Sequence, residues 1–332
     1  MRVRDLDYEL PPELIAQKPL PERDQSRLLV YERAGGSVRH RRFSDLPDEL
    51  RANDLLVLND TKVLAARLPL RRASGGAVEV LLLEQRDGEI WEALARPSRR
   101  LRVGERLFPA EADAQRAGAA GSVELVERVG DGRWSVRIVG ALAGETPLPP
   151  YIHERLDDSE RYQTVYASSS GSAAAPTAGL HLTPSLLEQL EHVFVTLHVG
   201  SDTFRPISVD TLGEHEMHGE RYTVDARAWQ RIVAAERVVA VGTTTVRALE
   251  SVVAPGLGSD EPVLAGRTEM MIAPGHRFTV VDALVTNFHL PRSTLLALVM
   301  AFAGVEETRE LYARAIEERY RFYSFGDAML IL

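Results

Sequence analysis

The segment VVDALVTNFHLPRSTLLALVMAFAG, residues 280–304, passes from a short apolar run through a polar turn into a longer apolar run. The first run has the length of a buried strand. The second has the length of a helix, with Pro291 near its start and Gly304 at its end. The segment RVVAVGTTTVRALESVV, residues 237–253, repeats this order. Such repetition is typical of an α/β sheet whose strands are buried on both faces.

In sheets of this kind, ligands bind beyond the carboxyl ends of the strands. A third apolar run, HVFVTLHVG at 192–200, begins in the same way and leads into polar residues. We therefore expect the polar segments at 198–204, 242–245 and 287–289 to lie together at one edge. Thr183 and Pro184 predict a helix start, which places His181 just before that helix. The sequence thus predicts a cleft lined by His, Thr and Asn side chains.

Residues from about 70 to 140 have a different pattern, with short β-rich runs around Asp-Gly pairs. AVEVLLLEQ and EIWEALARP flank Asp87-Gly88, and VELVERV and RWSVRIV flank residues 130–132. Asp and Gly tolerate the positive φ of tight turns, so both pairs predict hairpins of a small β-barrel or sandwich. The Ala/Gly-rich residues 109–121 indicate a loose loop. SSSGSAAAP at 168–176 has the composition of a flexible linker or of a mobile loop over the cleft.

Composition limits the class of protein. The 332 residues contain no cysteine, which excludes disulfides and thiolate metal sites, and they contain no apolar run long enough to cross a bilayer. The N-terminal residues lack the apolar core of a signal peptide, so we expect a cytoplasmic protein. A net charge of −9 argues mildly against a nucleic-acid partner. However, RPSRRLRVGER at 96–106 concentrates arginines, either as a phosphate-binding patch or as a solvated face.

The stretch EHEMHGERY at 214–222 has His215 and His218 one helical turn apart. It is compatible with a zinc site, with acid–base chemistry or with a solvated turn. Zinc sites need three or four protein or water ligands, and this stretch supplies two imidazoles without thiolates, so a metal is disfavoured. VGTTT at 241–245 matches neither a Walker A loop nor a dinucleotide-binding glycine motif. The chain also lacks the G-x-S-x-G motif of many serine hydrolases.

Several stretches, taken together, resemble the S-adenosylmethionine:tRNA ribosyltransferase-isomerase family of queuosine biosynthesis. In chain order they are LPPELIAQKPLPERDQSRLLV, LLVLNDTKVLAARL, YQTVYA, APTAGLHLT, VTLHVGSDTFRP, HEMHGERY, VGTTTVRALES, VDALVTNFHLPRSTLLALVMAFAG and YRFYSFGDAMLI. They extend from residue 10 to residue 331. The resemblance implies an α/β domain at 1–66 and 150–332 that is interrupted by a β-barrel at 67–149.

The resemblance also implies a reaction. The family transfers and isomerises the ribosyl group of S-adenosylmethionine onto 7-aminomethyl-7-deazaguanine at the tRNA wobble position, giving epoxyqueuosine, adenine and methionine. S-adenosylmethionine is then a consumed co-substrate, with no other cofactor and no metal. We expect a cytoplasmic monomer without membrane association. Two alternatives are an S-adenosylmethionine-dependent RNA methyltransferase, which would release no adenine, and a non-catalytic RNA-binding protein, which would not bind S-adenosylmethionine.

On this resemblance we expect three groups of site residues. Catalytic candidates are His181, His198, His218, His289 and Asp327. Substrate-binding candidates are Asn59, Asp60, Thr61, Arg67, Thr177, Gly179, Gly200, Thr203, Phe204, Arg205, His215, Glu220, Gly242, Thr243, Thr244, Arg247, Asn287, Tyr323 and Gly326. Candidates for contacts with the tRNA backbone are Lys62, Arg96, Arg99, Arg100 and Arg102.

The most specific expectation concerns TNFHLP at 286–291, which connects a predicted strand to a predicted helix. Pro291 disfavours helical geometry at Leu290, so the connection should be extended and its side chains available. The Asn287 amide can donate and accept in one plane, as a purine edge requires. The His289 imidazole can exchange a proton near neutral pH. Alternatively, both side chains satisfy backbone groups of the loop.

Overall fold

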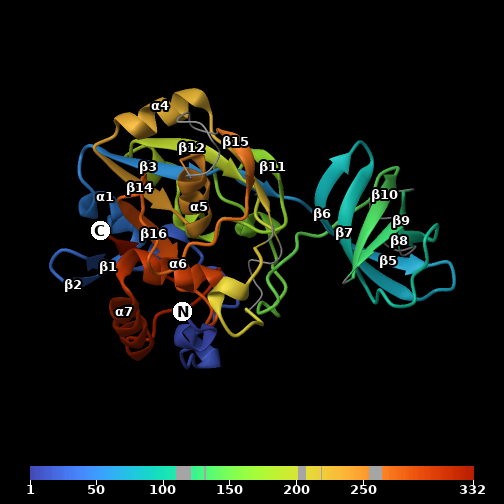
Figure 1. The fold of residues 1–332 in the computed structure, drawn as a ribbon, viewed down its shortest axis with the longest axis horizontal. Coiled ribbons are helices and arrows are strands. Elements are labelled where there is room, and N and C mark those ends of the chain that lie inside the picture. Colours follow the sequence, from blue (N-terminus) through green and yellow to red (C-terminus); the bar gives the residue numbers. More distant parts are fainter. Residues whose placement is uncertain (110–120, 131, 201–206, 218, 254–263) are drawn as a thin grey trace. The chain divides into compact units, whose positions relative to one another are not determined.

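The structure is a computed structural model that describes residues 1–109, 121–130, 132–200, 207–217, 219–253 and 264–332. These residues form two compact units (Figure 1). The larger comprises Met1–Thr61, Pro149–Ser169 and Ala175–Leu332, and the smaller comprises Lys62–Leu148 and Ser170–Ala174. The smaller unit thus begins before residue 67, because Leu64 and Ala66 already pack on its hydrophobic core.

Among the described residues, nine strands form the sheet of the larger unit, in the spatial order β15-β13-β12-β3-β14-β16-β17-β1-β2. In chain order they are β1 (Arg27–Glu32), β2 (Ser37–Arg42), β3 (Asp54–Asn59), β12 (His192–Leu197), β13 (Glu220–Thr223), β14 (Arg237–Val241), β15 (Ala265–Thr268), β16 (Ala283–Asn287) and β17 (Ala328–Ile331). Strands β12, β3, β14 and β16 are parallel neighbours, so their carboxyl ends share one edge. Strand β17 is antiparallel to β16 and parallel to β1, so both β17 and β1 begin at that edge.

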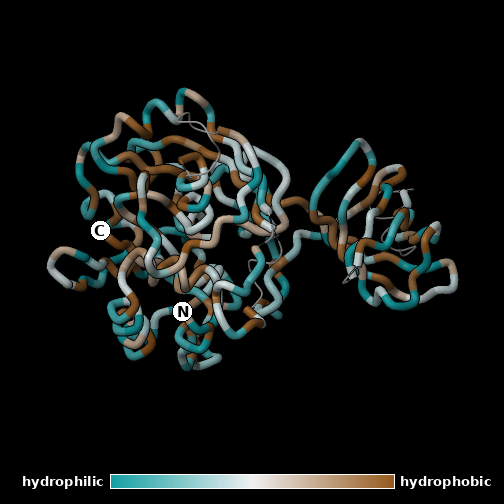
Figure 2. Tube along the Cα trace, viewed as in Figure 1, coloured by the Kyte–Doolittle hydropathy of each residue, from teal (hydrophilic) through white to brown (hydrophobic). Residues whose placement is uncertain are grey.

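Both faces of the central strands are covered, as the apolar runs predict. On one face Leu56, Val239 and Val285 share a core with residues of short helices such as Phe43 and Leu186. On the other face α5 packs against β3, β12 and β14. The tube in Figure 2 is hydrophobic along these strands. The α-helices of the described residues are α1 (Leu46–Glu49), α3 (Pro184–Leu187), α4 (Ala226–Ala234), α5 (Thr243–Val252), α6 (Thr294–Ala303) and α7 (Val305–Glu317).

Short 3-10 helices carry much of the chain between these elements. They are η1 (Val3–Leu6), η2 (Pro12–Leu14), η3 (Arg23–Gln25), η4 (Phe43–Asp45), η5 (Ser159–Tyr162), η6 (Thr177–His181) and η8 (Leu212–Glu214). No helix in the described ranges is both long and apolar enough to span a membrane.

The helix starts follow the capping signals, with two corrections. Thr183 caps α3 as predicted, because its Oγ1 accepts a hydrogen bond from Leu186 N at 3.3 Å. Helix α6 begins later than Pro291 suggests, because Ser293 Oγ accepts from Leu296 N at 3.1 Å and fixes the start at Thr294. Residues 243–245 form the first turn of α5 rather than a loop.

The smaller unit contains a closed six-stranded barrel in the order β10-β7-β6-β5-β8-β9. Its strands are β5 (Arg67–Arg72), β6 (Ala77–Asp87), β7 (Ile90–Arg96), β8 (Arg106–Pro109), β9 (Ser122–Gly130) and β10 (Arg133–Val139). Both predicted hairpins are present, and Gly88 at the first has φ +49°. Trp134, Val80 and Leu107 fill the barrel core. The loop predicted around 110–120 lies outside the described residues.

Both interpretations of residues 168–176 are wrong. Residues Ser169–Ser172 form β11, which pairs with β4 (Thr61–Val63) in a two-stranded sheet. Ala173, Ala174 and Ala175 are 5%, 0% and 5% exposed. The small side chains therefore allow close packing, and their composition does not indicate a linker here.

Candidate active site

Predicted site residues gather at the carboxyl edge of the sheet, but on its two opposite faces. Side chains alternate along a strand. Because Val285 belongs to the core that contains Leu186, Asn287 faces the same side, where η6 lies. Leu56 and Leu58 also face that core, so Asn59 faces α5 instead and contacts its Thr244. We call the two groups the η6-face network (Ser26, Thr177, His181, Asn287) and the α5-face network (Asn59, Gly200, Glu220, Thr244, Arg247).

Asn287 is the centre of the η6-face network. Its Nδ2 donates to Tyr323 O at 3.3 Å and contacts His181 Nε2 at 3.2 Å, while its Oδ1 accepts from Thr177 Oγ1 at 3.2 Å. Because the carbonyl of Tyr323 needs a donor, Nδ2 is the donor to His181 as well. His181 Nε2 therefore accepts, and its Nδ1–H donates to Ser26 Oγ at 2.7 Å. These partners fix a neutral tautomer of His181.

The surroundings of His181 also disfavour its charged form. Burial lowers its pKa to about 4, and the positive charges of Arg321 and Arg23 act in the same direction. The ring stacks on Phe43, with centroids 4.9 Å apart. His181 is thus a neutral, fixed group that orients the amide of Asn287.

His289 does not behave as predicted. It is 8% exposed, and burial lowers its pKa to about 3, so its imidazole does not titrate near neutral pH. Its Nε2 lies 2.7 Å from Thr286 Oγ1, and its carbonyl accepts from Tyr8 Oη. Asn287 is 2% exposed, so the two side chains are not available as Pro291 suggested. The connection after β16 is irregular, and its residues Phe288 and His289 are buried.

Asp327 is also buried, and both its oxygens bind main-chain amides. Its Oδ1 accepts from Arg27 N at 2.9 Å and its Oδ2 from Arg321 N at 2.8 Å. Burial raises its pKa. This carboxylate holds the start of β1 against the loop before β17.

Three other candidates on this side are explained by backbone geometry. Tyr323 has φ +71° and directs its carbonyl at Asn287. A Cβ at Gly326 would lie 2.4 Å from Arg321 O. A Cβ at Gly179 would lie 2.0 Å from Tyr166 Oη. Tyr323 is thus explained by its backbone conformation. Gly326 and Gly179 lack a side chain, which lets neighbouring segments approach closely.

In the α5-face network, Asn59 connects β3 to β12 and α5. Its Nδ2 donates to Leu197 O at 2.9 Å and Thr244 Oγ1 at 3.3 Å, and its Oδ1 accepts from Leu197 N at 3.0 Å. The helix begins after Gly242, which has φ +92°, and Thr243 and Thr244 in its first turn are 5% and 7% exposed. The predicted threonines are therefore buried beneath the edge.

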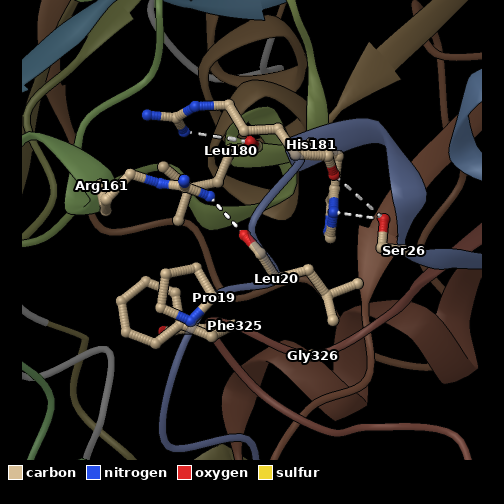
Figure 3. A pocket seen from close by; sticks show the side chains of 10 residues that line it. Pro19, Leu20, Ser26, Arg161, Leu180, His181, Phe325 and Gly326 are labelled. Carbon is tan, nitrogen blue, oxygen red and sulfur yellow. Dashed lines mark hydrogen bonds between the residues drawn. The ribbon is translucent and has the colours of Figure 1, made fainter.

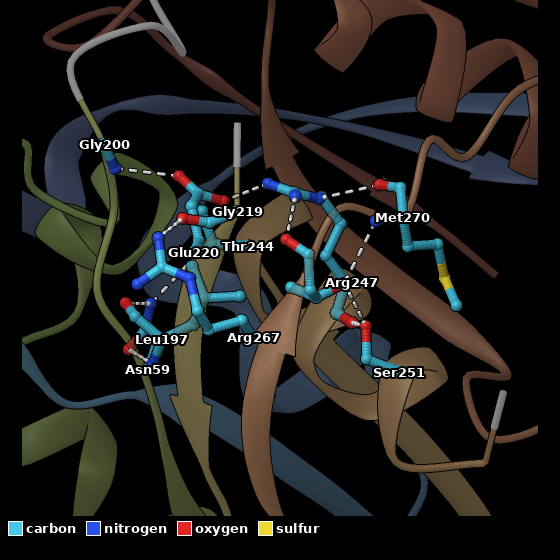
Figure 4. Close-up of polar contacts among 11 residues, drawn as sticks. Asn59, Leu197, Gly200, Gly219, Glu220, Thr244, Arg247, Ser251, Arg267 and Met270 are labelled. Atoms are coloured by element: carbon cyan, nitrogen blue, oxygen red, sulfur yellow. Dashed lines mark hydrogen bonds and ion pairs between the residues drawn. The ribbon is translucent and has the colours of Figure 1, made fainter. Parts of the chain in front are cut away.

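Glu220 and Arg247 form a buried ion pair, and both side chains are 7% exposed (Figure 4). Arg247 also donates to Met270 O at 3.2 Å. The second carboxylate oxygen of Glu220 accepts from Gly200 N at 2.8 Å. Each side chain thus binds protein groups, and the pair fixes the backbone at Gly200, where β12 leads into residues 201–206.

Asp60, Thr61 and His198 form a third group at the same edge. Asp60 accepts from Ser168 Oγ at 2.6 Å and from Thr196 Oγ1 at 2.7 Å. Thr61 Oγ1 lies 2.9 Å from His198 Nδ1. His198 is half-buried, unlike His181 and His289, which are buried.

The remaining candidates lie elsewhere. Thr203, Phe204, Arg205 and His218 are outside the described residues. Arg67 lies on β5 in the smaller unit, where its Nε donates to Glu79 at 2.6 Å. His215 is half-buried and has extended backbone at the end of η8, so the described residues that follow η8 are not helical. Within the described ranges, no group of three His, Asp or Glu side chains is arranged to hold a metal ion.

The predicted tRNA contacts lie in the smaller unit. Arg96 ends β7, and Arg99, Arg100 and Arg102 follow in the connection to β8. All four and Lys62 are exposed. Among the described residues, their side chains make no ion pair with a carboxylate. These charges are therefore available to a polyanion.

Sequence reasoning missed a pocket beside the η6-face network (Figure 3). It is lined by Pro19, Leu20, Arg23, Ser26, Arg161, Leu180, His181, Ser324, Phe325 and Gly326. The only signal for it was that the family-like stretch at 10–30 contains Arg23 and Ser26. Without the fold, nothing connects that stretch to residue 161.

The mixed sheet, with polar networks at the carboxyl edge of its parallel strands, and the β-barrel unit together define a two-unit α/β enzyme. The family model described as queuosine biosynthesis protein matches residues 3–331. The chain therefore belongs to this family.

Similar proteins extend over the full chain. The S-adenosylmethionine:tRNA ribosyltransferase-isomerases of Rubrobacter xylanophilus and Moorella thermoacetica are 52% and 51% identical, over 100% of this chain and 98% and 100% of theirs. The crystal structure of S-adenosylmethionine tRNA ribosyltransferase from Thermotoga maritima is 38% identical, with a TM-score of 0.56 over 99% of this chain and 100% of that one. None of these names favours a methyltransferase or a non-catalytic protein.

Proposed function

We propose that this chain is an S-adenosylmethionine:tRNA ribosyltransferase-isomerase that acts on 7-aminomethyl-7-deazaguanine at the tRNA wobble position. The ribosyl group moves from S-adenosylmethionine to the aminomethyl nitrogen, giving epoxyqueuosine, adenine and methionine. The observation that carries this proposal is the 51–52% identity to enzymes of that name over the whole chain.

The chemistry needs proton transfer. The sulfonium of S-adenosylmethionine acidifies the adjacent 5′ C–H, so a base can remove this proton, and adenine leaves more readily once an acid protonates it. His181 and His289 are neutral, buried and hydrogen-bonded. We place a proton-transfer role on His198 instead, since it is half-buried at the same edge and Thr61 orients its Nδ1.

The barrel arginines support the tRNA part of the proposal. Guanidinium groups bind phosphate oxygens and position a nucleic acid without reading its sequence. Arg96 at the end of β7 and Arg99, Arg100 and Arg102 in the connection to β8 offer four exposed charges within seven residues. The wobble base is in a loop, so it can leave its stack and enter a cleft at lower cost than from a duplex.

The reaction is tested by its products. We expect adenine and methionine in equal amounts, and only when the tRNA carries the aminomethyl-deazaguanine. Replacement of His198 by glutamine should lower turnover about 10²-fold or more, typical of a lost acid–base group. Methylated tRNA together with S-adenosylhomocysteine would refute the proposed reaction, whereas near-normal turnover of the variant would remove only His198 from it.

We also propose that the enzyme needs no metal or cofactor besides its co-substrate, acts as a monomer and is located in the cytoplasm with its tRNA. A base and an acid suffice for the steps above, which supports the first point. Light scattering of the protein alone and with tRNA tests the second.

A further inference from the structure

We propose that Arg23 and Arg161 form a subsite for the α-carboxylate of S-adenosylmethionine, in the pocket beside the η6-face network. This inference rests on the proposed function for the identity of the ligand. It assigns one end of the co-substrate to a defined place on the protein. We call the site the arginine pocket (Arg23, Arg161 and the residues that line the same cavity).

The two guanidinium groups are held in place by main-chain carbonyls. Arg23 donates to Leu180 O and to Glu160 O, both at 3.1 Å. Arg161 donates to Leu20 O at 2.6 Å and to Pro21 O at 2.7 Å. Carbonyls orient a cation without neutralising it. The site is thus ordered before a ligand arrives, which reduces the entropy lost on binding.

The positive charge of the pocket lacks a direct counter-ion. Among the described residues, no carboxylate forms an ion pair with Arg23 or Arg161. Burial lowers the pKa of Arg23, and the charge of Arg161 lowers it further, while the charges of Asp158 and Glu160 act in the opposite direction. Arg161 Nε is buried without a hydrogen-bond partner. A buried donor in this state gains from an incoming acceptor.

The small volume and the lining of the pocket favour a terminal anionic group. Its cavity volume is about 20 Å³, room for a water-sized group, between the apolar walls of Leu20, Leu180 and Phe325. A binding site for a phosphate within a tRNA chain must leave room for the polymer on both sides of that phosphate. A carboxylate at the end of a small molecule enters from one side, and its two oxygens match the guanidinium fork.

The position of the pocket also fits. His181 and Gly326 line it, and His181 Nε2 binds the Asn287 amide of the η6-face network. In Figure 3, Arg161 and His181 lie on different sides of the pocket. A carboxylate bound to Arg161 would therefore place the rest of S-adenosylmethionine near the edge where the strands end.

Calorimetry with two ligands tests the subsite without turnover or tRNA. Wild-type protein should bind S-adenosylmethionine about 10- to 100-fold more tightly than decarboxylated S-adenosylmethionine, the range for a charged hydrogen-bonded contact. Arg161→Met should lose most of this preference, because it weakens binding of the first ligand and leaves the second nearly unchanged. Arg161→Lys keeps the charge but not the fork, so an intermediate preference is expected.

Arg33→Met is the matched control. Arg33 also binds main-chain carbonyls through its guanidinium, Leu332 O at 3.2 Å and Phe302 O at 3.4 Å, but it is exposed and follows the opposite end of β1. It should keep the wild-type preference. Equal binding of both ligands by wild-type protein overturns the subsite, as does an undiminished preference in folded Arg161→Met. If that variant instead loses only tRNA affinity, the pocket is a phosphate site and the proposal is wrong. Absence of adenine release by wild-type protein refutes the proposed function separately.

Discussion

Replacing Glu220 by glutamine removes the charge from the buried pair with Arg247 and changes little else. The glutamine oxygen can still accept from Gly200 N, as one carboxylate oxygen does at 2.8 Å. Arg247 then remains 7% exposed with only neutral acceptors, the carbonyls of Met270 and Thr268 at 3.2 and 3.5 Å. Removing one partner of a buried ion pair typically costs about 3–5 kcal/mol. Because the carbonyls stay in place, we expect about 3 kcal/mol here.

Urea denaturation followed by circular dichroism measures this loss. Hydrogen exchange of the α5 amides assigns it to the larger unit, since Arg247 lies on that helix. The double variant Glu220→Gln with Arg247→Met should recover most of the stability, because it leaves no uncompensated charge. A single variant within about 1 kcal/mol of wild type would refute the reasoning, because the pair would then be worth no more than a solvated one.

Four further outcomes are expected. Arg99→Ala with Arg100→Ala should weaken tRNA binding and reduce the log–log salt slope by about one unit or less for each lost contact; Arg86→Ala, whose guanidinium already pairs with glutamates, should leave the slope unchanged. Burial lowers the pKa of His289 in the folded protein to about 3, below the usual 6.5. The free energy of unfolding should therefore be highest above pH 6.5 and should fall by about 1.4 kcal/mol per pH unit toward pH 3. Urea titrations of His289→Gln should show a smaller decrease over the same pH range. Gly326→Ala should destabilise by about 1–3 kcal/mol, measured by thermal unfolding, because its Cβ would overlap Arg321 O. Exhaustive chelation should leave turnover unchanged, and a loss restored by zinc alone would show that the enzyme needs metal.

The fold was largely predictable because local signals and the buried pattern agree. Asp87-Gly88 predicted a hairpin, and the apolar runs before residues 242 and 287 predicted buried strands. The shared edge followed from the rule for parallel strands. Local sequence patterns do not determine the order of the strands in the sheet. Only the order shows that β17 lies between β16 and β1, and thus that Asp327 contacts the start of β1.

The site was less predictable, because side-chain availability depends on packing from distant segments. Sequence placed Asn287 and His289 correctly at the edge, but Tyr8, 281 residues away, covers the carbonyl of His289. The pocket contains both Arg23 and Arg161, which are 138 residues apart in the sequence. In each case the residue type indicated which chemistry a side chain can perform. Its burial and its hydrogen-bond partners, which the fold determines, decided whether it is available to a substrate.

The position of β17 between β16 and β1 has a consequence for synthesis on the ribosome. The barrel strands lie within residues 67–139, so this unit can close while much of the chain is still untranslated. The nine-stranded sheet of the larger unit cannot be completed at that stage. Among the described strands, the β1–β2 hairpin joins the rest of the sheet only through β17, whose last residue is Ile331. Until that residue has left the exit tunnel, the hairpin has an unpaired strand edge, which is a site for aggregation and for chaperone binding.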